Sequence, residues 1–161
     1  MSFHTARFSS SRLTTFVSGI LGLTLSIADG AGAARASETD GEIVVSVSEL
    51  RNASGVVRIA LYAREGEWLS RETVSDCVAQ VHGEHARCSL GVHAPGTYAI
   101  AVLHDEDADG DMDRDFIGLP QEGYGFSSGA RPGFGPPSFG DASFEHGASR
   151  SDVPVRARYG L

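Results

Sequence analysis

Residues 97–104 read Thr-Tyr-Ala-Ile-Ala-Val-Leu-His and follow a Pro95-Gly96 turn. β-Branched and aromatic residues dominate this run, which is typical of a β-strand. The side chains of a strand alternate between its two faces, so one face carries Tyr98, Ile100, Val102 and His104. The sequence therefore predicts a strand that has a mostly apolar face and a histidine at its end.

Six further runs are strand-like and lie between turn-forming residues. They span residues 42–50, 55–64, 76–82, 86–90, 142–145 and 153–159. Residues 65–74, which hold the single tryptophan Trp68, are interpreted as a loop or one helical turn. No segment beyond residue 36 has a convincing helical period. About seven short strands predict an all-β fold, an antiparallel β-sandwich of immunoglobulin-like or transthyretin-like shape.

Residues 105–115 read Asp-Glu-Asp-Ala-Asp-Gly-Asp-Met-Asp-Arg-Asp, so seven of eleven side chains are carboxylates and only Arg114 offsets them. The spacing Asp105-x-Asp107-x-Asp109-Gly110 is that of the first half of a calcium loop, where the glycine permits a sharp turn. The segment is not an EF-hand, because the twelfth position is Phe116 instead of glutamate and a predicted strand precedes it.

We therefore predict an Asp-rich calcium loop at the end of a strand. The ligands expected first are Asp105, Asp107, Asp109 and the carbonyl of Asp111, and Asp113 or Asp115 would complete the shell. Magnesium suits the segment less well, because it keeps more of its waters. The alternative is a solvated acidic loop that binds no specific ion.

The N-terminus has the pattern of a secretory signal. A basic region with Arg7 and Arg12 precedes an apolar run over 13–28, and residues 34–36 (Ala-Arg-Ala) fit a small-x-small cleavage site. Cleavage after Ala36 would leave a single domain, 37–161, in the periplasm or outside the cell, without stable membrane insertion. The alternative is an uncleaved N-terminal anchor. The mature part would hold 10 arginines against 20 acids, a net charge of −10 that argues against nucleic acid as a partner.

The chain has two cysteines, Cys77 and Cys88. An even number in an exported chain favours a disulfide. Such a bridge would pin the hairpin predicted over 76–90, whereas two free thiols are the alternative.

Residues 118–140 are too long for an ordinary connection. They hold seven glycines, four prolines and the four aromatic residues Tyr124, Phe126, Phe134 and Phe139. Because disordered linkers are usually poor in aromatic residues, we expect an ordered loop. Its rings would either cap the core or face a ligand, and Arg131 and His104 join them as candidate ligand-binding residues.

Residues 125–129 (Gly-Phe-Ser-Ser-Gly) match the pattern of a nucleophile elbow, which requires a helix after the serine. Arg131-Pro132-Gly133 forbids that helix, so a chance match is favoured. A hydrolase that uses Ser127, His104 and a loop acid is therefore only an alternative interpretation.

Several of these segments together resemble domain-of-unknown-function family 2141, a family of exported bacterial proteins. The resemblance is carried by residues 55–62, 96–105, the Asp-rich loop, 118–120, 122–127 and 134–139, and it covers about 41–160. Family members often have Asn where this loop has Asp, and the cysteine pair is not part of the pattern. The resemblance implies a secreted or periplasmic β-sandwich with no assigned activity, and it supplies no catalytic residues.

The sequence thus favours an exported, non-enzymatic β-sandwich module whose loop is stabilised by calcium. Its expected partner is a glycan, a peptide or an envelope protein. A structural subunit of the envelope, joined to its neighbours through strand edges, is a further alternative.

Overall fold

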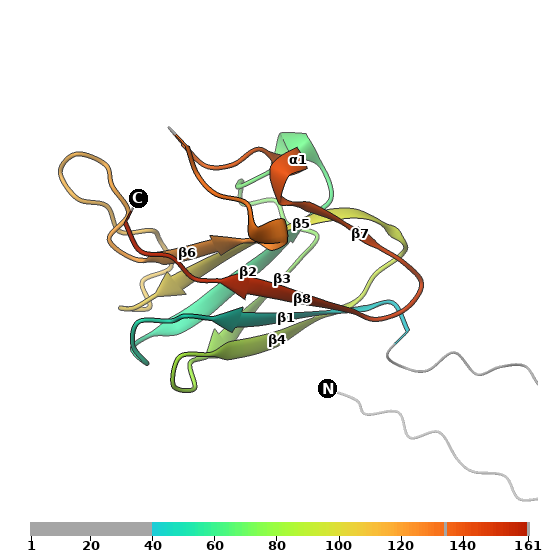
Figure 1. Cartoon of the computed structure of the whole chain (residues 1–161), viewed down its shortest axis with the longest axis horizontal. Helices are drawn as coiled ribbons and strands as arrows, with labels where there is room; N and C mark the ends of the chain where they lie inside the picture. Colours follow the sequence, from blue (N-terminus) through green and yellow to red (C-terminus); the bar gives the residue numbers. More distant parts are fainter. Residues whose placement is uncertain (1–39, 134, 161) are drawn as a thin grey trace, which may run out of the picture. The chain divides into compact units, whose positions relative to one another are not determined.

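The structure is a computed structural model that describes residues 40–133 and 135–160. The predicted signal segment and the candidate ligand residue Phe134 lie outside the described residues. The described part contains eight strands in two sheets (Figure 1). The strands are β1 (Glu42–Ser48), β2 (Val56–Tyr62), β3 (Ser75–Gln80), β4 (Ala86–Val92), β5 (Gly96–Asp105), β6 (Gly123–Phe126), β7 (Ser143–His146) and β8 (Ser151–Arg156). Three single turns complete it: η1 (Glu65–Glu67), η2 (Ser127–Gly129) and α1 (Phe139–Ala142).

The two sheets face one another, which confirms the predicted all-β sandwich. One sheet has the order β4-β1-β8 and the other β3-β2-β5-β6, with β7 added beside β5. All pairs are antiparallel except β1 with β8, which are parallel. These two strands are the first and the last of the described part of the chain, so no tight turn sets their relative direction.

The core lies between the sheets and follows the predicted alternation. Its members are at most 8% exposed and alternate with outward-facing residues. They include Ile43, Val45 and Val47 of β1, Val57, Ile59 and Leu61 of β2, Ile100 and Val102 of β5, and Val153 and Val155 of β8. The side chains that the two-residue period predicted to face inward therefore form the contact between the two sheets.

A disulfide joins the two sheets along one side of the sandwich. Cys77 on β3 is bonded to Cys88 on β4, as predicted, with a Cα–Cα distance of 6.6 Å. The turn between these strands is closed by pairing of His82 with His85. On either side of that turn, β3 and β4 belong to different sheets. The disulfide therefore links the two sheets and does not stabilise the two-stranded hairpin that the sequence predicted. A disulfide that closes a loop of this length contributes about 3 kcal/mol to the free energy of unfolding in the chain-entropy model.

The opposite side is closed by β6, a strand that the sequence did not predict within the Gly/Pro/aromatic segment. Tyr124 of β6 pairs with Arg158, just beyond β8. A Cβ atom placed on Gly125 would lie 2.6 Å from Val155 Cγ1 and 2.7 Å from the Arg156 carbonyl oxygen. The glycine therefore lets β6 approach β8 more closely than any other residue would permit.

We predict that Gly125→Ala destabilises the fold by about 1–3 kcal/mol, because the added methyl group overlaps Val155 and the backbone of Arg156. Urea denaturation of the variant would measure the loss. The matched control is Gly147→Ala, where an added Cβ would meet nothing within 4 Å. Equal stability of the two variants would contradict the close approach of β6 and β8.

Candidate metal centre and the polar network around it

The acidic segment begins where β5 ends, and the structure gathers three of its predicted ligands. Asp105, Asp107 and Asp109 each offer one carboxylate oxygen, and these three oxygens lie within 4.8 Å of one another. Asp105 is buried, whereas Asp107 and Asp109 are exposed. The three residues therefore form an open cluster with a buried base, which we call the Asp triad.

Asp105 lies on the outward face of β5, yet its side chain is fully buried because the following loop folds back over it. The backbone N–H groups of Asp109 and Gly110 donate to its carboxylate at 3.1 and 3.0 Å, and Gly110 adopts a φ of 94° to do so. The Arg58 guanidinium, on the neighbouring strand β2, donates to the same carboxylate.

These contacts set the charge state of Asp105. Burial alone would raise the pKa of its carboxyl, but the hydrogen bonds from Arg58, Gly110 and Asp109 outweigh burial, so the pKa lies below its ordinary value. Asp105 is therefore ionised near neutral pH, and Arg58 offsets part of the negative charge in the triad.

The exposed members of the triad hold the loop through short Asp turns. Asp107 Oδ1 accepts the N–H of Asp109 at 3.2 Å, and Asp109 Oδ1 accepts the N–H of Asp111 at 2.8 Å. Side chains that accept a backbone N–H two residues on mimic a backbone turn. The alternate spacing of the aspartates thus shapes the loop and also gathers the carboxylates.

The other predicted ligands lie outside the Asp triad. Asp115 uses Oδ1 to accept the N–H groups of Ile117 and Leu119, at 3.0 and 2.8 Å, and so closes a separate turn. Asp111 and Asp113 do not join the three gathered carboxylates. The structure therefore gathers three of the candidate carboxylates, and the carboxylates of Asp111 and Asp113 are not among them.

Glu122 fastens the acidic segment to the sandwich, a role that sequence reasoning missed. Its side chain is only 3% exposed and accepts the N–H of Glu106 at 2.7 Å and the N–H of Asp113 at 3.3 Å. One carboxylate thereby ties together two places in the loop that are seven residues apart. The only sequence signal was an acid directly before β6, in a segment whose strand was not recognised.

Glu106 joins the loop to the connection between β1 and β2. The guanidinium of Arg51 and the amide of Asn52 both donate to its carboxylate. The pKa of Glu106 lies below its ordinary value, chiefly because of the hydrogen bond from Arg51. This ion pair anchors the second residue of the acidic segment, beside the triad.

His104, a candidate ligand-binding residue, lies inside the sandwich and is hydrogen-bonded there. Its side chain is fully buried. Nε2 lies 3.0 Å from the carbonyl oxygen of Ser54, and Nδ1 lies 2.7 Å from the hydroxyl of Tyr159. A carbonyl only accepts, so Nε2 carries the proton and the Tyr159 hydroxyl donates to Nδ1. The same hydroxyl oxygen accepts the N–H of Arg51 at 2.9 Å. Tyr159 thus links the His104 ring to the backbone of Arg51 through hydrogen bonds, and we call this chain of bonds the relay.

We predict that Tyr159→Phe lowers the free energy of unfolding by about 1–3 kcal/mol, because it leaves His104 Nδ1 without a donor inside the fold. Chemical denaturation would measure the loss. The matched control is Tyr98→Phe, which removes one hydroxyl bond to the carbonyl of the exposed residue Ala94 and should cost about 0.5–1 kcal/mol. A loss for Tyr159→Phe no larger than that of the control would contradict the relay.

The predicted aromatic loop packs its described rings onto the sandwich. Tyr124 is 6% exposed, and its hydroxyl donates to the Gly160 carbonyl at 2.6 Å. Phe126 and Phe139 are half-buried, with ring centroids 5.9 and 6.1 Å from that of Trp68. These rings therefore cap the core, which is one of the two roles expected for them. Phe126 also lines a pocket, and Arg131 is exposed.

The structure does not bring Ser127 and His104 together. Ser127 is fully buried, and its Oγ accepts the N–H of Ile100 and donates to the Ala142 carbonyl. It therefore lies beside Ile100, four residues before His104 on β5. At roughly 3.3 Å per residue, this places the serine about 13 Å from the histidine along the strand. The hydroxyl and both imidazole nitrogens are each occupied by structural hydrogen bonds.

Two large apolar residues that sequence reasoning did not single out lie exposed directly after the acidic segment. Phe116 is 98% exposed and Ile117 is 64% exposed. They occupy the turn that the Asp115 carboxylate closes. Exposed apolar side chains that lie together occur at interaction sites more often than single ones.

Comparison with known proteins identifies the family of this chain. The model of a family described as an uncharacterized protein conserved in bacteria (DUF2141) matches residues 45–153. No curated protein and no solved structure matches the chain. Among the described residues, no helix is long and apolar enough to cross a membrane.

Proposed function

We propose, from the premise that this chain belongs to the DUF2141 family of uncharacterized bacterial proteins, that it is an exported, non-enzymatic β-sandwich module with a calcium-stabilised loop. The ion would bind at the Asp triad. The observation that carries the proposal is the approach of three carboxylate oxygens to within 4.8 Å of one another. Oxygen ligands at such separations suit a hard cation.

The charge balance of the site supports a divalent ion. Three carboxylates less the Arg58 guanidinium leave two net negative charges, equal and opposite to the charge of one calcium ion. Without an ion, the exposed carboxylates of Asp107 and Asp109 repel one another across a short distance. Calcium accepts irregular oxygen shells that include waters, so three side chains, a carbonyl and solvent suffice. Magnesium requires a stricter octahedral shell.

The proposed export is supported by the predicted signal segment and by the disulfide. Cys77 and Cys88 are bonded, and structural disulfides persist mainly in oxidising compartments. The periplasm and the extracellular medium are both compartments of that kind. A calcium site of the extracellular type, with a Kd of about 10⁻⁴–10⁻³ M, fits such surroundings.

Partner binding is the role proposed for the ordered loop. Phe116 and Ile117 are exposed and directly follow the segment that carries the Asp triad. An ion that fixes the triad would restrict the motion of this apolar tip and so reduce the entropy lost when a glycan, a peptide or an envelope protein docks.

We predict that calcium at about 100 times its Kd stabilises the protein by about 2.7 kcal/mol, which corresponds to a rise in Tm of roughly 10 °C. Magnesium at the same concentration should give a smaller rise. Thermal melts of the purified protein with calcium, with magnesium and with chelator would measure both. Asp107→Asn and Asp109→Asn should each abolish most of the calcium response, because each removes a charged ligand.

The matched control is Asp111→Asn, which changes the same charge in the same loop but lies outside the gathered carboxylates. It keeps the Asp111 carbonyl and should retain most of the calcium response. A parent protein that melts identically with calcium and with chelator would refute the site. Equal losses in all three variants would instead indicate a general effect of loop charge, and would also refute it.

A further inference from the structure

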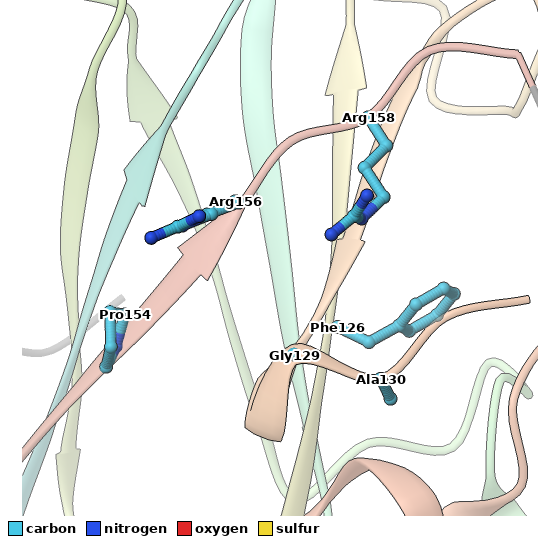
Figure 2. A pocket seen from close by; sticks show the side chains of 6 residues that line it. All are labelled: Phe126, Gly129, Ala130, Pro154, Arg156 and Arg158. Atoms are coloured by element: carbon cyan, nitrogen blue, oxygen red, sulfur yellow. The ribbon is translucent and has the colours of Figure 1, made fainter.

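A pocket lies on the outer surface where β8 meets the end of β6 and η2, away from the Asp triad. Its volume is about 230 Å³, and its lining residues are Phe126, Gly129, Ala130, Pro154, Arg156 and Arg158. The three residues from β8 and its extension occupy alternate positions that face away from the core, because Val153, Val155 and Ala157 point inward. Figure 2 shows the Arg158 side chain, just beyond the end of β8, reaching toward Phe126, whereas the Arg156 side chain on β8 points away from that ring.

The guanidinium groups of this pocket are poorly neutralised, in contrast to most arginines of the fold. Among residues 40–133 and 135–160, Arg158 has no side-chain hydrogen bond or ion pair. Arg156 faces Glu49 at 3.6 Å, in a pair whose side chains are 72% and 60% exposed. A pair so exposed contributes little. In a chain with a net charge of −8, two available guanidinium groups beside one pocket form a local site for an anion.

The rest of the lining is apolar and includes a ring. Phe126 is half-buried, and Pro154 and Ala130 contribute further apolar surface. A volume of about 230 Å³ equals that of roughly seven or eight waters in the liquid, at about 30 Å³ each. The pocket therefore suits one ring-sized group that carries an anionic substituent, with few polar contacts to orient it.

We propose that this pocket binds a hexuronate unit of an acidic glycan. The carboxylate would pair with the Arg158 guanidinium, whose planar fork can donate two parallel hydrogen bonds to it. The C–H face of the sugar would pack on Phe126, and Arg156 would add a second positive charge at the rim.

A peptide carboxylate fits this place less well than a sugar acid. An extended peptide gains affinity by adding to a free strand edge. Here the backbone of Arg158 is already paired in both directions with Tyr124, at 2.7 Å for the N–H of Arg158 and 2.9 Å for the N–H of Tyr124. At Arg158 the pocket thus offers a side chain and not a free backbone edge.

This inference goes beyond the proposed function, because the pocket shares no residue with the apolar tip of Phe116 and Ile117 that is proposed to contact a partner. Its geometry uses no residue of the acidic segment, so it can fail or succeed independently of calcium. Titrations carried out both with calcium and with chelator would keep the two proposals distinguishable.

The test is a titration of the ¹⁵N-labelled protein with sodium glucuronate, followed by the shifts of the Gly129 and Ala130 amides and of Arg158 Nε. Glucose, a short acidic peptide and sodium phosphate serve as comparison ligands at matched ionic strength. We expect saturable shifts with glucuronate and none with glucose. Arg158→Gln should weaken glucuronate binding by about tenfold or more, because it removes the charged donor. Arg158→Lys, which keeps the charge but loses the fork, should weaken it less.

The matched control is Arg71→Gln, which makes the same charge change at an exposed arginine outside the pocket. It should keep the affinity within about twofold, because screened charges at a distance contribute little. An absence of saturable shifts with glucuronate would overturn the proposal. So would equal weakening by Arg71→Gln and Arg158→Gln, or binding of the peptide or phosphate in preference to glucuronate.

Discussion

The arrangement of the candidate site depends on the end of β5, where two consecutive polar side chains are buried on opposite faces of one strand. His104 points into the sandwich and Asp105 points out of it, and both are 0% exposed. A buried polar group is tolerated only when its hydrogen bonds are made within the fold. Each of these residues therefore dictates where its partners must lie, and the partners come from distant parts of the chain.

On the inner face, the hydrogen bonds that the buried His104 side chain requires fix the positions of two loops. The carbonyl of Ser54 accepts from the ring on one side, and the Tyr159 hydroxyl donates to it on the other. Tyr159 in turn accepts the N–H of Arg51, whose guanidinium carbon lies 4.6 Å from the centroid of the tyrosine ring. The connection after β1 and the segment after β8 are thus held against the same end of β5.

On the outer face, Asp105 imposes a similar constraint on the acidic segment. The loop must return over the strand, because two of its own backbone N–H groups satisfy the carboxylate. Glu106 and Glu122 then attach the loop to Arg51 and to the approach of β6. Acids that look alike in sequence consequently divide into two groups. Asp105, Glu106 and Glu122 attach the loop to the sandwich, whereas Asp107 and Asp109 remain exposed and bond only within the loop.

Sequence patterns predicted what depends on local periodicity and did not predict what depends on distant partners. The strands with apolar alternation were recognised, because each inward position carries a large side chain such as Ile59 or Val102. The strand β6 was missed, because glycine occupies two of its four positions and leaves no alternation to read. The spacing of the aspartates predicted the gathering of Asp105, Asp107 and Asp109, which are close in sequence. The roles of Glu122, Arg58 and Tyr159 could not be predicted, because each has a partner at least 16 positions away.

Arg58 determines how an ion would act on this loop. Because the guanidinium already pairs with Asp105, the base of the triad is neutralised and ordered without a metal. The repulsion that remains is between Asp107 and Asp109, which no arginine contacts among the described residues. An ion would therefore gain most of its binding energy from these two exposed carboxylates and would change the exposed part of the loop more than the strand beneath it. The fold of the sandwich would then persist without calcium, whereas the conformation of the tip that carries Phe116 and Ile117 would depend on it.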